Sequence, residues 1–141
     1  MVKYHLHFLC IKKGISMFFE HYFENENGWL HIYILPNEHI QGDIFMISSW
    51  LEGDVQGGCR FLELFNAYME APDRDEYELS GNSCELLIKK DFTTIRWNWY
   101  DEVPDSCTLP TEMLYEILKV WVAKNKELRE EEMKNEAKRT K

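Results

Sequence analysis

The sequence lacks the features that are typical of membrane and secreted proteins. No apolar run approaches the roughly 18 residues that a membrane-spanning helix needs. The first residues alternate between polar and apolar types and do not form the unbroken apolar core of a signal peptide. The four cysteines are far apart and contain no Cys-x-x-Cys pair, which excludes zinc-ribbon and thioredoxin-like sites. We therefore expect a cytoplasmic protein with reduced thiols.

Positive charge is also scarce. The chain has 16 lysines and arginines against 25 aspartates and glutamates, which gives a formal net charge of −9. Phosphate groups repel such a chain, so neither nucleic acid nor an anionic membrane is expected as its partner. The acidic excess lies in the middle of the chain, because residues 43–106 carry 5 bases and 14 acids, whereas residues 107–141 carry 8 bases and 7 acids.

The chain has enough apolar material for one folded domain. Its 141 residues are 45% hydrophobic and 14% aromatic, which suits a single hydrophobic core. We expect residues 1–141 to form one domain that is a monomer or a weak dimer. Residues 129–141 are mostly charged and are expected to form a solvated, fraying helix end.

Alternation with a period of two predicts strands at several places. It is present in residues 1–10 and in the run 29–35. Residues 15–24 fit either a helix or a strand, but Asn27-Gly28 between two apolar runs is a hairpin signal and favours a strand. Three further strand-like runs, separated by turns, predict an antiparallel meander: 76–80, 84–89 and 92–100.

Helical spacing predicts three helices. Asp43 is placed to N-cap a short helix through Leu51, with Gly53 just past its end. A second helix is expected from about residue 61 to Pro72. The third begins at Thr108 or Thr111 and is long. Its apolar stripe follows the i, i+3, i+4, i+7 pattern: Leu114, Ile117, Leu118 and Trp121. The pattern predicts an α+β fold, a largely antiparallel β-sheet with a long C-terminal helix packed on one face.

The acidic residues gather in two clusters at the ends of the predicted meander, so they are expected to share one rim of the sheet. The clusters are Glu70, Asp73, Asp75, Glu76 and Glu78, and Asp101, Glu102 and Asp105. Three interpretations are open: solvated loops that favour solubility, a calcium site, or a docking surface for a basic partner. The calcium interpretation is weak because the glycine and the bidentate glutamate of an EF-hand loop are missing.

Trp97 and Trp99 are separated by one residue and so share one face of the predicted strand. They either pack in the core or stand on an open face, where aromatic rings beside acids are typical of a protein-binding patch. A further alternative is an aromatic pocket around Trp97 and Trp99 that holds a small ligand or a substrate.

Residues for catalysis or metal binding form no recognisable motif. His5, His7 and His31 could approach one another on neighbouring strands, but no acid or cysteine stands at a ligand spacing beside them. No base stands at a characteristic spacing from a serine or cysteine, and no phosphate-binding glycine motif is present. The sequence therefore assigns no catalytic residue, metal or cofactor, and the protein is not expected to be an enzyme.

The C-terminal half resembles a known class of protein. The residues that carry the resemblance are the turn and strands of 77–86, Thr93-Thr94-Ile95, and the segment 107–112 before the helix that contains Trp121. They resemble small bacterial immunity proteins that accompany polymorphic and contact-dependent growth inhibition toxins, over about residues 76–125. The resemblance implies a non-enzymatic inhibitor that binds one toxin, often a basic nuclease.

Together these observations predict an immunity protein that neutralises a cognate, basic toxin through an acidic surface. The expected partner-binding residues are the two acidic clusters together with Trp97 and Trp99. The alternatives are a small-ligand-binding protein or enzyme with an aromatic pocket, and a structural domain that forms homo-oligomers. A broad acidic face would favour the inhibitor, whereas a deep apolar cavity would favour the ligand-binding protein.

Overall fold

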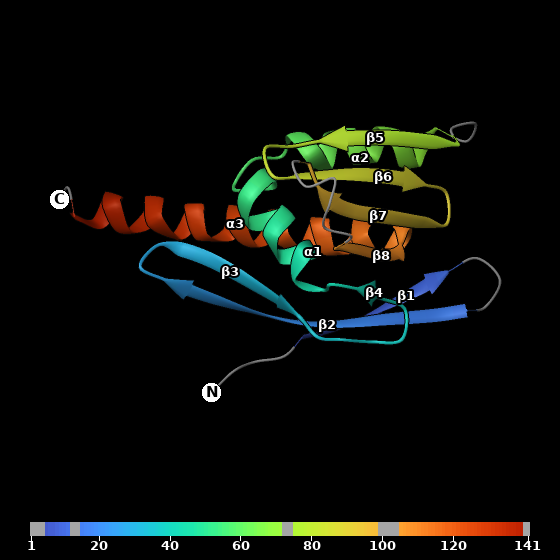
Figure 1. The fold of residues 1–141 in the computed structure, drawn as a ribbon. Coiled ribbons are helices and arrows are strands. Elements are labelled where there is room, and N and C mark those ends of the chain that lie inside the picture. Colours follow the sequence, from blue (N-terminus) through green and yellow to red (C-terminus); the bar gives the residue numbers. More distant parts are fainter. Residues whose placement is uncertain (1–4, 12–14, 72–74, 99–104, 140–141) are drawn as a thin grey trace.

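The computed structural model describes residues 5–11, 15–71, 75–98 and 105–139, which form an α+β fold with two antiparallel sheets (Figure 1). The strands are β1 (His5–Ile11), β2 (Ile15–Glu26), β3 (Trp29–Ile34), β4 (Gln41–Gly42), β5 (Glu76–Ser80), β6 (Cys84–Lys89), β7 (Phe92–Trp97) and β8 (Ser106–Pro110). The helices are α1 (Phe45–Trp50), the π-helix η1 (Leu51–Val55), α2 (Arg60–Glu70) and α3 (Thr111–Arg139). The predicted fold class is confirmed, but two sheets take the place of the one sheet that we expected.

The smaller sheet has the strand order β1-β2-β3. Its second hairpin turns at Asn27 and Gly28, whose φ angles of 52° and 87° lie in the left-handed region that a tight hairpin turn of this kind requires. The turn aligns Tyr22 with Tyr33 across β2 and β3. The hairpin signal therefore resolved the ambiguity of residues 15–24 correctly in favour of a strand.

The larger sheet has the strand order β4-β8-β7-β6-β5. Strands β5, β6 and β7 confirm the predicted meander. Strand β7 ends at Trp97, and residues 99–100 of the predicted run lie outside the described residues. Strand β8 was not predicted, because Thr108 and Pro110 suggested a helix start. In the structure, α3 follows β8 without a loop, and the N–H of Thr111 donates to the carbonyl of Asp91 at 3.0 Å.

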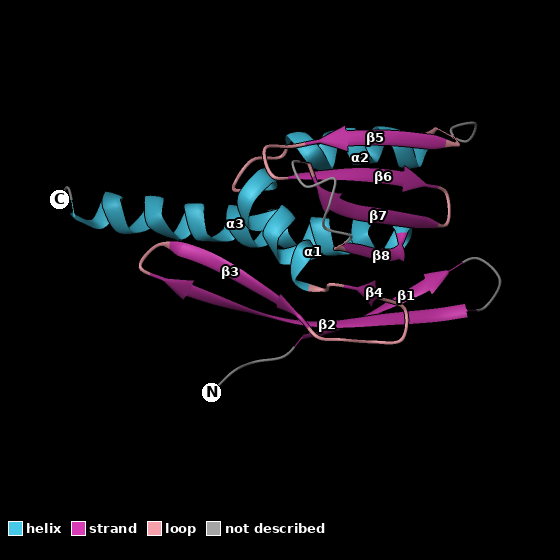
Figure 2. Ribbon diagram, viewed as in Figure 1, coloured by secondary structure: helices cyan, strands magenta, loops and turns pink. Residues whose placement is uncertain are grey.

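The helices connect the two sheets. Helices α2 and α3 lie behind the five-stranded sheet in Figure 1, and the three-stranded sheet lies on the side of β4 (Figures 1 and 2). Helix α1 contacts β3 of the smaller sheet as well as β7 and β8 of the larger one, and α3 contacts β2. One core therefore extends between the sheets.

The apolar stripe of α3 lies in that core. Leu114, Ile117 and Leu118 are fully buried, and Trp121 is 2% exposed. The indole N–H of Trp121 donates to the backbone carbonyl of Gln56 at 2.7 Å, so the ring is buried without an unsatisfied donor. These contacts confirm the predicted packing of the C-terminal helix.

The segment after α1 differs from the prediction. Asp43 accepts a hydrogen bond from the N–H of Phe45 at 3.0 Å, close to the expected helix start. The chain does not leave the helix at Gly53, because α1 continues into the wider turn of η1, in which the N–H of Gln56 donates to the carbonyl of Leu51 at 2.8 Å. The predicted end of the α-helix at Leu51 agrees with its C-cap, but Gly53 lies inside η1 and does not mark the end of the helical segment.

Helix α3 extends well beyond the core. Residues 129–139 are helical and exposed, and this part projects from the rest of the molecule (Figure 1). The expected solvation of the C-terminal segment agrees with this exposure. Its fraying stays a prediction.

Candidate functional site

Six of the ten residues that the sequence assigned to partner binding lie in the described part of the chain. Glu70, Asp75, Glu76, Glu78 and Asp105 are exposed, and Trp97 is half-buried. The other four lie outside the described residues: Asp73, Trp99, Asp101 and Glu102.

The described members of the two acidic clusters do not share a rim. Glu76 pairs with Lys89 at one end of the five-stranded sheet, whereas Ser106, which follows Asp105, pairs with Arg96 at the opposite end. The clusters are also separated across the sheet, because β6 and β7 lie between β5 and β8. The expectation of one continuous acidic rim was therefore wrong for these residues. The chain reverses direction three times between the start of β5 and the start of β8. Because three is an odd number, these two strand starts lie at opposite ends of the sheet.

The outer face of the five-stranded sheet pairs much of its own charge. Glu76 and Lys89 form an ion pair at 3.5 Å. The guanidinium of Arg96 binds the carboxylate of Glu85 on the neighbouring strand. Such exposed pairs add little stability, but they reduce the negative field that this face presents to a partner.

Trp97 lies on the other face of the same sheet. It is aligned with the buried Cys84 across β6 and β7, and it packs against the core. Of the two alternatives for Trp97, packing in the core and exposure on an open face, the structure shows packing against the core. The ring is not part of the outer face. Sequence alone left this open because a strand's alternation does not say which face is covered.

Aromatic and acidic side chains lie together on the three-stranded sheet, where the sequence did not assign a site. In β2, Met17, Phe19 and His21 are buried, so the alternate residues face away from the core. Those alternate residues are Phe18, Glu20, Tyr22 and Glu24. We call this surface the aromatic–acidic face and define it by Leu6, Phe18, Glu20, Tyr22, Glu24 and Tyr33.

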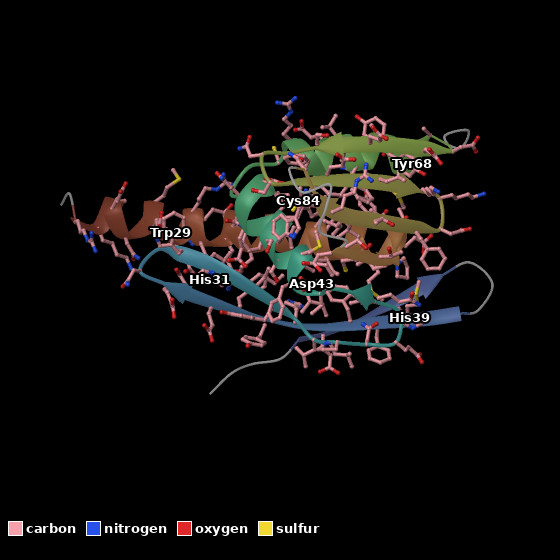
Figure 3. The ribbon with its side chains drawn as sticks, viewed as in Figure 1. Trp29, His31, His39, Asp43, Tyr68 and Cys84 are labelled. Carbon is pink, nitrogen blue, oxygen red and sulfur yellow. The ribbon has the colours of Figure 1, made fainter. Side chains whose placement is uncertain are left out.

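The aromatic–acidic face presents large apolar groups to solvent. Leu6 is 49% exposed and Phe18 is 37% exposed. Tyr22 and Tyr33 are directly opposite each other on β2 and β3 and stack with their ring centroids 4.6 Å apart. Trp29, which is 73% exposed, lies beyond them near the β2–β3 turn (Figure 3).

The aromatic–acidic face carries acidic residues and no lysine or arginine, and His31 lies opposite Glu24 at its rim. Glu20 and Glu24 stand beside the aromatic rings, and β1, β2 and β3 contain no lysine or arginine. The carboxylate of Glu24 also contributes to the raised pKa of the neighbouring Tyr33, although burial of the phenol is the larger cause. This face therefore combines apolar anchors with an unbalanced negative charge. The signal that could have located it is the period of two in residues 17–24, which is obscured because aromatic residues occur on both faces.

Residues of α1 and η1 cover the free edge of β3. The hydroxyl of Ser48 donates to the carbonyl of Ile32 at 2.7 Å, and Glu52 accepts from the N–H of the same residue at 3.4 Å. Glu52 also contacts the imidazole Nδ1 of His31 at 2.5 Å. This hydrogen bond is the main reason why the pKa of His31 is raised above its usual value. Glu52 therefore serves a structural role and holds His31 at the rim of the aromatic–acidic face.

The described residues offer no metal site. Among them, no group of three or more histidine, cysteine, aspartate or glutamate side chains is arranged to hold an ion. The expectation that His31 lies on a strand next to His5 and His7 was wrong, because β2 separates β1 from β3.

The described cysteines are poor nucleophiles. Cys84 and Cys107 are buried in the core, and burial raises the pKa of each thiol to about 12. Cys59 is exposed, and its thiol donates to the carboxylate of Glu63 at 3.4 Å. These environments provide no activated thiol.

The described residues line three surface hollows that are large enough to hold part of a partner. One, of about 490 Å³, lies between β5 and α2. Another, of about 500 Å³, lies between the two sheets and is lined by His39, Lys90 and Phe92 among others. The third, of about 560 Å³, lies between the β2–β3 turn and α3 and includes Trp29 and Trp121.

Comparison of the chain with models of protein families, with curated proteins and with solved structures finds no match. Within the described residues, no helix is both long enough and apolar enough to cross a membrane.

Proposed function

We propose that this chain is a non-enzymatic, cytoplasmic inhibitor of the immunity-protein type, and that it neutralises a basic protein toxin through the aromatic–acidic face. The observation that carries the proposal is the combination of exposed apolar groups with Glu20 and Glu24 on strands that contain no lysine or arginine. The resemblance of residues 76–125 to bacterial immunity proteins supports the choice of partner.

The two kinds of side chain on this face would have different roles. Phe18 and the stacked pair of Tyr22 and Tyr33 supply rigid rings, which bury a large area at low cost in conformational entropy. Glu20 and Glu24 would attract a basic partner and speed its association. A toxin that binds nucleic acid presents the matching surface, because its cleft must attract phosphates.

The test starts from the product of the gene next to the one that encodes this chain, since immunity proteins accompany their toxins. We expect that product to arrest growth of a host cell and this chain to restore growth. With the purified pair, the double variant Glu20→Lys and Glu24→Lys is expected to slow association at least tenfold. The change is expected to weaken as the salt concentration rises.

A matched control carries the same change of net charge at another place. Glu127→Lys and Glu130→Lys lie on the exposed part of α3 and should leave the association rate within about twofold, because they are outside the proposed interface. Phe18→Ala tests the apolar part and should speed dissociation more than it slows association. Equal rates for both pairs of lysine variants would contradict the proposal.

A second candidate function is the binding of a small molecule. The hollow of about 500 Å³ between the sheets has the size of many ligand sites, and it includes His39 and Lys90 beside the ring of Phe92. These residues differ from the aromatic pocket around Trp97 and Trp99 that the sequence suggested. The acids Glu38, Asp91 and Glu112 line the same hollow, so its charge does not select an anionic ligand. A screen of small organic compounds by thermal shift would support this function if Phe92→Ala and Lys90→Ala abolished a stabilisation seen with the unchanged protein.

A further inference from the structure

Strand β5 forms a free edge of the five-stranded sheet. It is the last strand in the order β4-β8-β7-β6-β5, and no other described strand pairs with its far side. The N–H of Gly81 donates to the carbonyl of Cys84 at 2.9 Å, which makes these two residues a hydrogen-bonded pair. Because such pairs alternate along an antiparallel ladder, the backbone groups of Glu76, Glu78 and Ser80 point to the free edge.

A hollow lies beside this edge. Its volume is about 490 Å³, and it is bounded by β5 and by the first turns of α2. Figure 1 shows α2 directly behind β5. The apolar part of its lining comes from Phe61 and Leu64 of α2 and from Tyr77 and Leu79 of β5. An unpaired strand edge beside a groove that has both polar and apolar lining residues is a geometry in which extended peptides bind as an added strand.

The charged side chains around the β5 edge differ between its two ends. Glu76 and Glu78 are exposed on the outer face, and Glu70 and Asp75 are exposed nearby, where α2 ends and β5 begins. Arg60 lines the groove together with Ser80, at the other end of β5. Asp54 also lines the groove at this end. A bound strand would therefore meet negative charge near Glu78 and the start of β5, whereas near Ser80 the charges of Arg60 and Asp54 offset each other.

We propose that the β5 edge and its groove bind an extended protein segment in which basic and apolar residues alternate. The segment adds to the sheet as a further strand. Residues opposite Glu76 and Glu78 lie on the outer face, where lysine or arginine pairs with Glu78 and competes with Lys89 for Glu76. Residues opposite Tyr77 and Leu79 lie on the inner face, where apolar side chains enter the groove beside Phe61 and Leu64.

A second copy of this chain fits the edge poorly. Antiparallel pairing of two β5 strands would bring the glutamates of one copy close to those of the other, and like charges on adjoining strands are destabilising. The charge of the edge therefore selects a basic segment from another protein.

The probe is a synthetic capped peptide of the sequence Lys-Val-Lys-Val-Lys with a fluorescent label, titrated at physiological salt concentration. The first control is a peptide of the same composition in the order Lys-Lys-Lys-Val-Val. The second is the alternating peptide with N-methyl groups on the lysine amides, which removes the hydrogen bonds to β5 and keeps the charge. We expect the methylated control to bind at least about tenfold more weakly, because its lysine amides can no longer donate hydrogen bonds to β5. We expect the reordered control to bind at least about tenfold more weakly as well, because its lysine and valine side chains no longer alternate between the two faces of the sheet.

The matched variants are Glu78→Lys and Glu130→Lys, which change the net charge equally. Glu78→Lys is expected to weaken binding of the alternating peptide about tenfold and to permit binding of its counterpart Glu-Val-Glu-Val-Glu, whereas Glu130→Lys leaves both affinities unchanged. Hydrogen exchange should slow at the amides of Glu76, Glu78 and Ser80 when the alternating peptide binds.

Three results would overturn the inference. Equal binding of the N-methylated peptide would mean that only charge attracts it. Slowed exchange in β2 and β3 without any in β5 would place the peptide on the aromatic–acidic face. A dimer of the chain that Glu78→Lys abolishes would make a second copy the occupant. The inference stands apart from the proposed function, because the peptides test the β5 edge without any toxin.

Discussion

Asp54 and Gly81 are in such close contact that a Cβ atom on Gly81 would lie 2.5 Å from the carboxylate of Asp54. The contact arises because the Asp54 carboxylate spans the β5–β6 turn. One oxygen accepts from the N–H of Ser83 at 2.8 Å and the other from the N–H of Cys84 at 2.9 Å. Asp54 thus connects η1 to the β5–β6 hairpin through two hydrogen bonds. At position 81, only a residue without a side chain fits against the carboxylate of Asp54.

The first prediction concerns this contact. Asp54→Ala removes both hydrogen bonds to the β5–β6 turn and should lower the free energy of unfolding by about 2–4 kcal/mol, since bonds to a charged acceptor are among the stronger ones. Gly81→Ala should also destabilise, because the new methyl group displaces the carboxylate. Urea denaturation measures both, and Asp91→Ala, at an exposed turn, serves as the control. A loss for Asp54→Ala no larger than that of the control would show that the contact contributes nothing.

A second prediction follows from the pair of His31 and Glu52. The pKa of His31 is raised above 6.5 in the folded protein, chiefly by its hydrogen bond to Glu52. A raised pKa stabilises the fold fully below the unfolded value and loses this effect as the pH rises through the folded value. The destabilisation caused by His31→Gln should therefore be larger at about pH 6 than at about pH 9. In a Glu52→Gln background, where the main partner is neutral, the difference between the two pH values should become much smaller, because only the weaker effects of Glu24 and Glu26 still raise the pKa of His31.

A third prediction concerns the thiols. Cys84 and Cys107 are buried with pKa values of about 12, whereas Cys59 is exposed. The side chain of Cys10 lies outside the described residues, so the test uses a Cys10→Ser background. At about pH 8, a thiol reagent should modify Cys59 quickly and the two buried thiols only as fast as the protein unfolds. Addition of denaturant should expose all three, and rapid reaction of three thiols in the native protein would contradict the predicted burial.

Much of the fold could be predicted because several segments carry a strong local signal. The meander strands, the Asn27-Gly28 turn and the apolar stripe of α3 all depend on short-range periodicity and turn chemistry. Strand β8 was missed because it has five residues and contains Pro110, which is typical of a helix start. Its strand form depends on pairing with β7, a contact that no local pattern reveals.

The candidate site was harder to predict than the fold. Sequence clustering drew attention to acids that are close in the chain, but Glu76 and Asp105 are far apart in the sheet. The aromatic–acidic face is built from β2 and β3, and its identity depends on which face of the sheet α1 and α3 cover. That choice is a matter of tertiary packing. Phe18 and Phe19 are chemically equal neighbours, yet one is exposed and the other fully buried.

The fourth prediction tests the packing of α3. Leu118→Ala and Trp121→Ala should each lower the free energy of unfolding by about 2–5 kcal/mol, because both side chains are buried and no neighbour fills the space that they leave. Trp121→Phe distinguishes the packing of the indole from its hydrogen bond. This variant keeps an aromatic ring in the core and removes the hydrogen bond to Gln56. Its cost should be smaller than that of alanine. Lys126→Ala, at an exposed position of the same helix, should stay within about 0.5 kcal/mol of the unchanged protein.

The last prediction concerns the projecting end of α3. Residues 129–139 are all exposed, so a chain that ends at Leu128 should keep nearly all of its unfolding free energy. Arg129 and Asn135 line the hollow next to Trp29, but exposed contacts of this kind contribute little. A chain that ends at Val120 is the control, because it loses the buried ring of Trp121 and should be strongly destabilised. Thermal unfolding of the two truncated chains measures the difference. A large fall in melting temperature for the longer one would mean that the helix end packs in solution, against the β2–β3 hairpin or against another copy.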